Sequence, residues 1–158
     1  MLRLILVFLA LYCESAAMAL AADSLHEVRK SFTIGGKPIP AEIFADFGDA
    51  WMSDSRPIVV TIDAKAAIDS NRYADSIKTN GRWVEQVKPG SASFNGPETM
   101  SYEYYGATAN GLLVLVAAYS GGGSGTFYSL HVLDAASNRA FDEDGSTYPR
   151  LDLTWCAL

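Results

Sequence analysis

Residues 111–134 read GLLVLVAAYSGGGSGTFYSLHVLD, and this stretch decides the predicted fold. Its first part, Leu112–Tyr119, is an unbroken apolar run, which only a strand covered on both faces or a buried helix can hide from water. The short length of the run and its flanking turns favour the strand. After the glycine-rich segment 120–125, the residues up to Asp134 include many β-branched and aromatic side chains that suit a pleated sheet. The two runs are therefore predicted to pair as a hairpin at the centre of a sheet.

Pairs of turn-forming residues predict further hairpins on the N-terminal side of this centre. Gly35-Gly36 can supply the positive φ angles of a tight turn before an edge strand that contains two prolines. Asn80-Gly81 and Asn110-Gly111 are typical of two-residue hairpin turns, and the first of them would place Lys78 opposite Trp83. The segments that these turns are expected to join are 31–34 with 42–44, 73–79 with 82–87, and 100–108 with 112–119.

The remaining segments predict loops, turns, one helical turn and a last strand. Asp63 is a suitable cap for a short helix at residues 64–68, the one place where the sequence favours a helix. Segments rich in glycine, serine, proline and aspartate have no hydrophobic period and are expected to lie at the surface. The predicted loops and turns are 46–57, 88–97, 135–138 and 144–145, and the predicted last strand is 151–154.

These runs predict an all-β fold made of consecutive hairpins. Roughly eight to ten short strands separated by turns have the spacing of antiparallel sandwiches and barrels. The prediction is an antiparallel β-sandwich or an open barrel, with at most one short helix. Residues 22–158 are expected to form one domain, long enough to bury a core. Cys156 is the only cysteine in this part of the chain, so packing rather than an internal disulfide must hold the fold together.

Residues 1–21 have the pattern of a cleavable signal peptide. Arg3 precedes the apolar run 4–12, and small residues follow up to Ala19-Leu20-Ala21, an A-x-A cleavage site. The apolar run is too short to cross ~30 Å of hydrocarbon, so no membrane anchor is expected after cleavage. The predicted location is therefore the bacterial periplasm or the outside of the cell. The formal net charge of −6, with basic residues scattered along the chain, predicts no nucleic-acid partner.

Two loops resemble phosphate-binding or metal-binding motifs, and each lacks part of the pattern. Gly121–Gly125 has neither the Gly-Lys-Ser/Thr ending of a phosphate-binding loop nor the second glycine of a nucleophile elbow. Asp142–Gly145 resembles half of a calcium loop, but the first and last EF-hand positions would fall on Ala140 and Leu151. No metal and no cofactor are predicted, and calcium binding at Asp142–Asp144 is left open.

One serine–histidine pair and several carboxylates are the remaining candidates for catalysis. Ser129 and His131 share a strand face, but side chains two residues apart are expected to hold their tips too far apart for a working hydrogen bond. Any two of Glu85, Glu98 and Glu103 would make an acid–base pair if the fold brought them together, and the sequence gives no rule for this. No catalytic residue is therefore predicted.

The predicted site is a patch of tyrosines beside the glycine loop. If the hairpins close as their turns predict, Tyr102 lies opposite Tyr119, and Ala117 lies opposite Tyr128. Alternation then places the four tyrosines of this region on one face. The predicted ligand-binding residues are Tyr102, Tyr104, Tyr119 and Tyr128, together with Ser124 of the loop.

Tyrosine offers a flat ring for stacking and a hydroxyl group for hydrogen bonds, so the expected ligand is a small glycan or a peptide. The alternative is that these rings simply finish the core. The expected function is a non-catalytic binding or accessory module. Two further possibilities stay open at this point: a small secreted hydrolase that uses carboxylates, and an interaction protein that pairs through a sheet edge. The oligomeric state is also open.

Overall fold

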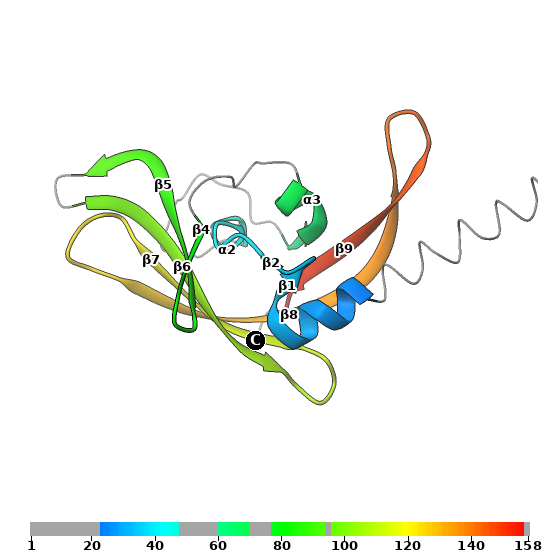
Figure 1. Ribbon diagram of the computed structural model, residues 1–158, viewed down its shortest axis with the longest axis horizontal. Helices are drawn as coiled ribbons and strands as arrows, with labels where there is room; N and C mark the ends of the chain where they lie inside the picture. The colour runs from blue at the N-terminus through cyan, green and yellow to red at the C-terminus, as the bar shows by residue number, and fades with distance from the viewer. Residues whose placement is uncertain (1–22, 48–59, 70–76, 94–95, 157–158) are drawn as a thin grey trace, which may run out of the picture.

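The computed structural model describes residues 23–47, 60–69, 77–93 and 96–156, and they form a mostly β structure (Figure 1). The helices are residues 23–31, α2 (Ile43–Asp46) and α3 (Ala64–Asp69). The strands are β1 (Thr33–Ile34), β2 (Lys37–Pro38), β3 (Thr61–Asp63), β4 (Ile77–Asn80), β5 (Trp83–Ser93), β6 (Gly96–Ala107), β7 (Leu113–Ser120), β8 (Phe127–Phe141) and β9 (Thr147–Trp155). The all-β prediction is confirmed.

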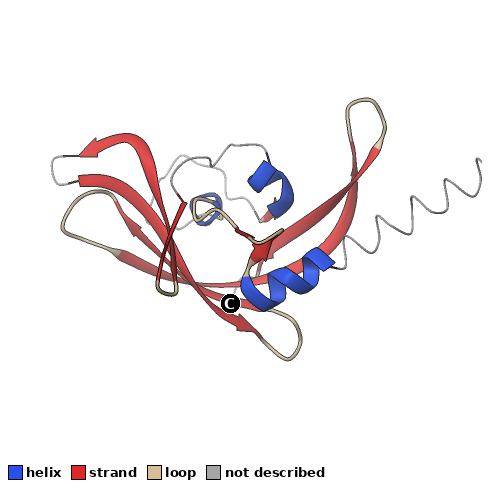
Figure 2. Cartoon of the chain, viewed as in Figure 1, coloured by secondary structure: helices blue, strands red, loops and turns tan. Residues whose placement is uncertain are grey.

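Strands β3 to β9 form one antiparallel sheet of seven strands in the order β3-β9-β8-β7-β6-β5-β4. The sheet is strongly curved, and the helices and the β1–β2 hairpin lie on its concave side (Figure 2). We call the concave side the inner face and the convex side the outer face. Strand β7 is the middle strand of the sheet, so residues 111–134 do form its centre, as the sequence predicts.

The layer on the inner face is made of short helices and a two-stranded hairpin instead of a second large sheet. Helix α3 is where the sequence predicts it, and Asp63 caps it by accepting hydrogen bonds from the backbone N–H groups of Lys65 and Ala66 at 3.1 and 3.3 Å. The helix at residues 23–31 and helix α2 exceed the single short helix that was predicted.

Helix α2 replaces the strand that was expected at residues 42–44. Ile43, Phe44 and Phe47 are all buried, and the backbone N–H of Phe47 donates to the carbonyl of Ile43 at 3.2 Å. These residues are spaced by one, three and four positions, as on one face of a helix. The segment is too short for the sequence alone to distinguish this helical period from a strand.

The core lies between the inner face of the sheet and this helical layer. Phe32, which directly follows the first helix, is fully buried and packs against the rings of Tyr102 and Tyr104 at centroid distances of 5.2 and 5.5 Å. Its φ of +55° is left-handed, a conformation that costs a non-glycine residue about 1–2 kcal/mol. Packing of this ring, which also contacts Phe44, offsets that cost.

The turn between β4 and β5 differs from its prediction by one residue. Trp83 pairs with Asn80, and Lys78 pairs with Glu85. Gly81 has a φ of +62°, which suits the first central position of a type II′ turn, where glycine is favoured. The turn is therefore centred on Gly81 and the residue after it, and not on Asn80-Gly81.

Two segments that were predicted as loops are parts of strands. Residues 135–138 lie inside the long strand β8, where Ala135 is buried and Asn138 pairs with Arg150, so the turn predicted there is wrong. Most of the predicted loop 88–97 belongs to β5 and β6, whose register shifts between Val87 and Ala92. The turn at Asp144-Gly145 and the last strand are found as predicted.

Several predictions fall on residues that the structure does not describe. The signal peptide at 1–21 and most of the predicted loop 46–57 lie outside the described residues. Among the helices that are described, none has the length and apolar character needed to cross a membrane.

Candidate functional site

Three of the four predicted tyrosines lie on the inner face. Tyr102 pairs with Ala117 and Met100 pairs with Tyr119, so each partner differs by two residues from the predicted one. The difference arises because a five-residue loop joins β6 to β7 and a bulge lies between Tyr104 and Gly106. A shift of two residues leaves every side chain on its predicted face.

Tyr128 lies on the outer face, which corrects the prediction. It pairs with Ala118 and not with Ala117, because the glycine loop joins β7 and β8 with a register one residue away from the predicted one. A register shift of one residue moves every side chain of a strand to the other face of the sheet. Phe127 therefore lies on the inner face, opposite Tyr119. Tyr128 is 67% exposed, and its ring makes an edge contact with Trp83 at 6.3 Å.

Tyr102 and Tyr104 belong to the core. Tyr102 is 2% exposed, and its hydroxyl group has no hydrogen-bond partner within the described part of the chain. Burial raises the pKa of this hydroxyl. The Tyr104 hydroxyl donates to the backbone carbonyl of Arg29 at 2.5 Å, and burial raises its pKa while the positive charge of Arg29 opposes that shift. These two rings finish the core, which was the alternative interpretation of the tyrosine patch.

Ser129 and His131 are hydrogen-bonded, which also corrects the prediction. The distance between Ser129 Oγ and His131 Nε2 is 2.9 Å. Alternate residues of a strand lie about 7 Å apart along the backbone, and the long imidazole spans this gap by leaning along the strand. His131 is only 4% exposed, and its ring lies 4.8 Å from that of Phe44 in helix α2.

Exposure falls steadily along the inner face of β8 towards this pair. Phe127 is 53% exposed, Ser129 is half-buried and His131 is buried. Beside Phe127 on β7 is Tyr119, which is half-buried and whose hydroxyl lies so close to the glycine loop that a Cβ at Gly121 would be 3.2 Å from it. We call Tyr119, Phe127, Ser129 and His131 the inner-face site.

Helix α2 is tied to the sheet beside the inner-face site. The backbone N–H of Glu42 donates to Gln86 Oε1 at 3.1 Å, and Gln86 Nε2 donates to Glu42 Oε2 at 3.4 Å. Gln86 on β5 pairs with Met100 on β6, which in turn pairs with Tyr119, so these contacts lie two strands away from Tyr119 in the same row across the sheet. They hold the Phe44 ring of α2 over His131.

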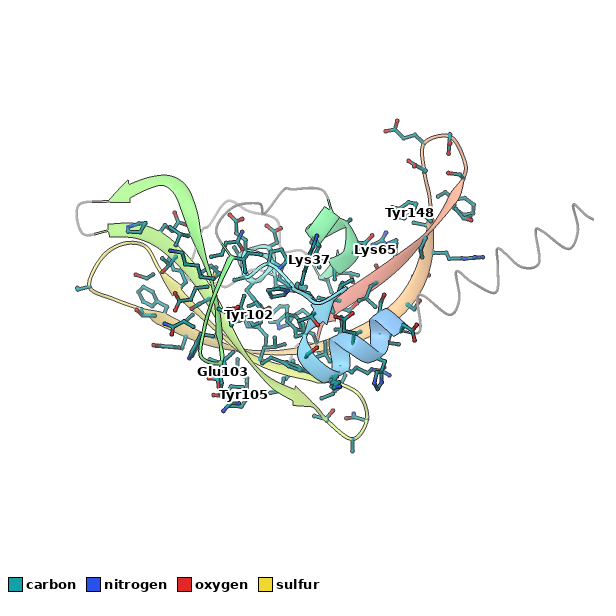
Figure 3. All side chains as sticks on the ribbon, viewed as in Figure 1. Lys37, Lys65, Tyr102, Glu103, Tyr105 and Tyr148 are labelled. Atoms are coloured by element: carbon teal, nitrogen blue, oxygen red, sulfur yellow. The ribbon has the colours of Figure 1, made fainter. Side chains whose placement is uncertain are left out.

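Arg82 and Glu103 form an ion pair on the outer face. Arg82 Nε lies 2.8 Å from Glu103 Oε1, the Tyr105 hydroxyl donates to Glu103 Oε2 at 3.2 Å, and the Arg82 guanidinium lies 5.3 Å from the centroid of the Tyr105 ring. Figure 3 shows Tyr102 on the inner side of the sheet, and Glu103 and Tyr105 on the outer side. Strand alternation puts Glu98 on the inner face, so Glu98 and Glu103 do not form an acid–base pair.

Two carboxylates of the acidic turn 142–146 accept hydrogen bonds from backbone N–H groups of the same turn. Asp144 Oδ1 accepts a hydrogen bond from the backbone N–H of Ser146 at 2.8 Å, and this bond lowers the pKa of Asp144. Asp142 accepts one from the backbone N–H of Glu143 at 2.8 Å. Nowhere in the described residues do three or more His, Cys, Asp or Glu side chains gather as metal ligands would.

A shallow groove of about 240 Å³ lies between α3 and β9, with Lys65 and Tyr148 at its rim (Figure 3). Its lining residues are Asp63, Lys65, Ala66, Tyr148 and Pro149. The carboxylate of Asp63 already caps α3 and lies 3.5 Å from Arg150 Nε. The groove therefore offers a ligand little beyond one lysine and one tyrosine. Ser124, the fifth predicted site residue, is exposed in the glycine loop.

No family model matches this sequence, and neither a curated protein nor a solved structure matches it significantly. The functional interpretation therefore rests on the geometry of the inner-face site.

Proposed function

We propose that this domain is a binding module that takes a sugar on the inner-face site. The observation that carries the proposal is the gradient of exposure along β8, from the open ring of Phe127 to the buried imidazole of His131. A ligand that lies against Phe127 and Tyr119 can reach the hydrogen-bonded pair of Ser129 and His131 with one polar edge.

The residue types at the site suit a sugar ring. The apolar C–H face of a pyranose packs on the flat rings of Phe127 and Tyr119, while its hydroxyl groups exchange hydrogen bonds with Ser129. A hydroxyl–imidazole pair contains both donors and acceptors, as a sugar hydroxyl requires. Export of the chain, which we also propose from residues 1–21, would place such a module where free glycans and cell-wall glycans occur.

A calorimetric screen of mono- and oligosaccharides, with short peptides as the competing class, tests this proposal. Phe127→Ala and Ser129→Ala are each expected to weaken binding of the best sugar about tenfold or more, corresponding to ~1.4 kcal/mol. The matched control is Tyr128→Ala, which removes an exposed ring from the adjacent position on the outer face and is expected to leave affinity unchanged. The proposal fails if Tyr128→Ala weakens binding and the two inner-face variants do not, or if only peptides bind.

The distance of 2.9 Å between Ser129 and His131 also favours a second candidate function, acyl hydrolysis. In that reaction Ser129 Oγ attacks the carbonyl carbon of an ester, His131 Nε2 takes the serine proton and passes it to the leaving alcohol, and water then hydrolyses the acyl-serine. Acetylated sugars in the same screen separate the two functions, because a binder leaves them intact. A hydrolase releases acetate, and Ser129→Ala abolishes the release.

Pairing through a sheet edge has less support from the structure. The two edge strands, β3 and β4, have three and four residues. Short edge strands are one of the ways in which sheets avoid pairing with other chains.

A further inference from the structure

A buried carboxylate lies on the outer face of the sheet. Glu103 is only 8% exposed, although it lies on the side away from the helical layer (Figure 3). In the strand register, its neighbours on either side are Trp83 on β5 and Val116 on β7. A carboxylate with so little water around it is stable only with a positive charge or hydrogen-bond donors beside it. The surroundings of Glu103 therefore favour a cation at this place.

Aromatic rings lie beside this carboxylate. Tyr105, two residues further along β6, donates its hydroxyl to Glu103 Oε2 at 3.2 Å, and it is 57% exposed. The rings of Trp83 on β5 and Tyr128 on β8 make an edge contact at a centroid distance of 6.3 Å. Because β6 and β7 lie between β5 and β8, these two rings meet above the strands that carry Glu103 and Val116. The faces of such rings carry partial negative charge and attract cations. We call Trp83, Glu103, Tyr105 and Tyr128 the outer-face site.

Arg82 supplies a cation to the outer-face site from within the chain. Its Nε lies 2.8 Å from Glu103 Oε1, and its guanidinium carbon lies 5.3 Å from the centroid of the Tyr105 ring, within the range of a cation–π contact. Arg82 belongs to the turn between β4 and β5, and its side chain is 68% exposed. An ion pair with one partner so open to water contributes little to stability. Another cation that makes the same contacts can therefore displace Arg82.

We propose that the outer-face site binds the guanidinium group of an arginine side chain in a peptide. The contacts of Arg82 show that a guanidinium fits against both Glu103 and the Tyr105 ring. Trp83 and Tyr128 extend the aromatic wall beyond the ring that Arg82 contacts, and tryptophan is the ring that binds cations best. When no ligand is bound, Arg82 keeps the buried carboxylate paired.

A guanidinium suits the outer-face site better than an ammonium group does. It is planar, so its face can stack on an aromatic ring while its edge donates two N–H groups to a carboxylate. A lysine ammonium is a more strongly hydrated point charge. The formal net charge of −6 attracts cationic peptides to the chain as a whole. The outer-face site lies on the opposite side of the sheet from the proposed sugar site, so either proposal can fail without the other.

Titration with acetyl-arginine amide, followed by the NMR signals of Trp83 and Tyr105, tests the site. Acetyl-citrulline amide is the matched ligand control, because citrulline has nearly the same shape as arginine and no charge. We expect the arginine derivative to shift both signals and the citrulline derivative to leave them in place. Glu103→Gln keeps the shape of the side chain and removes its charge. It should weaken binding about tenfold or more, as expected for the loss of hydrogen bonds to a charged group.

Removal of the internal cation gives the most specific result. Arg82→Ala is expected to bind acetyl-arginine amide at least about threefold more tightly than the wild type, because the ligand no longer competes with a guanidinium of the chain itself. The matched control is Arg139→Ala, which removes the same charge from an exposed position on β8 and should bind like the wild type.

Equal affinities of Arg82→Ala and the wild type would overturn the proposal, and so would a citrulline derivative that shifts the signals as strongly as the arginine derivative. Unchanged binding by a folded Glu103→Gln protein would also contradict it. Circular dichroism shows whether the variants are folded. If Arg82→Ala is not, Arg82→Gln replaces it, because it removes the charge and keeps most of the side chain. If Glu103→Gln is not, the comparisons of the two ligands and of the Arg82 variant decide.

Discussion

Tyr102 and Tyr104 are neighbours on the inner face whose hydroxyl groups are in opposite situations. The Tyr104 hydroxyl donates to the carbonyl of Arg29, whereas the Tyr102 hydroxyl is buried and has no partner among the described residues. A buried polar group without a hydrogen bond costs about 1–3 kcal/mol, and a satisfied one contributes about 0.5–1.5 kcal/mol. The two tyrosines therefore make an internal comparison.

We expect only one of the two tyrosine-to-phenylalanine variants to lose stability. Tyr104→Phe should lower the free energy of unfolding by about 0.5–1.5 kcal/mol because its hydrogen bond is lost. Tyr102→Phe should leave stability unchanged or raise it, because the ring stays and only the unpaired hydroxyl is removed. Urea denaturation measures both. A loss of stability in Tyr102→Phe as large as that in Tyr104→Phe would show that the Tyr102 hydroxyl is bonded after all.

Single residues also show where sequence-based prediction of the site reached its limit. Alternation along a strand placed Tyr102, Tyr104 and Tyr119 on one face, and the even register shift preserved this result. The face on which Tyr128 lies depends on the register that the glycine-rich loop sets between β7 and β8, and a difference of one residue reverses it. No sequence pattern specifies this register. The hydrogen bond between Ser129 and His131 depends on rotamers, which the sequence does not reveal either.

At the scale of elements, Glu27 joins the first helix to the β1–β2 hairpin. Its carboxylate accepts hydrogen bonds from the backbone N–H groups of Gly36 and Gly35 at 2.7 and 2.8 Å, and from the Thr33 hydroxyl at 2.7 Å. These bonds, the one from Gly36 first, lower the pKa of Glu27 below its ordinary value of 4.5. The ionised form is therefore the one that stabilises the hairpin.

The stabilisation by Glu27 should depend on pH. A carboxyl group whose pKa is lowered by folding contributes stability above its ordinary pKa, and the contribution is lost as the pH falls through the lowered value. Glu27→Gln should therefore be less stable than the wild type near neutral pH, and the difference should shrink as the pH falls below 4.5. Thermal denaturation across this range measures the effect. Glu143→Gln, in the exposed turn after β8, is the control. A Glu27→Gln deficit that does not change with pH would contradict this role.

Glycine-containing turn signals marked where the chain reverses direction, but they did not fix the register of the strands on either side. Gly35-Gly36 and Asp144-Gly145 do make turns, because glycine adopts positive φ without strain. The run Ala135–Asn138 contains no glycine or proline and continues as strand β8, since Ala135 is buried in the core. Helix α2 was missed because four residues carry too little periodicity to compete with a strand.

At the scale of the whole molecule, the apolar run of β7 explains the architecture. A strand that is apolar on both faces requires cover on both, and the sequence therefore favoured two layers of sheet. The structure provides the inner cover with short helices, whose amphipathic patterns the sequence shows only weakly.

The central claim is that the ligand binds on the inner face of β7 and β8, and mapping of backbone amide chemical shifts by NMR tests it most directly. The protein is titrated with the tightest-binding sugar from the screen. We expect the largest shifts on Tyr119, Phe127, Ser129 and His131, while the amides of Trp83 and Tyr105 on the neighbouring strands and those of β4 stay in place. The largest shifts on Trp83 and Tyr105, or shifts scattered without a focus on β7 and β8, would contradict it.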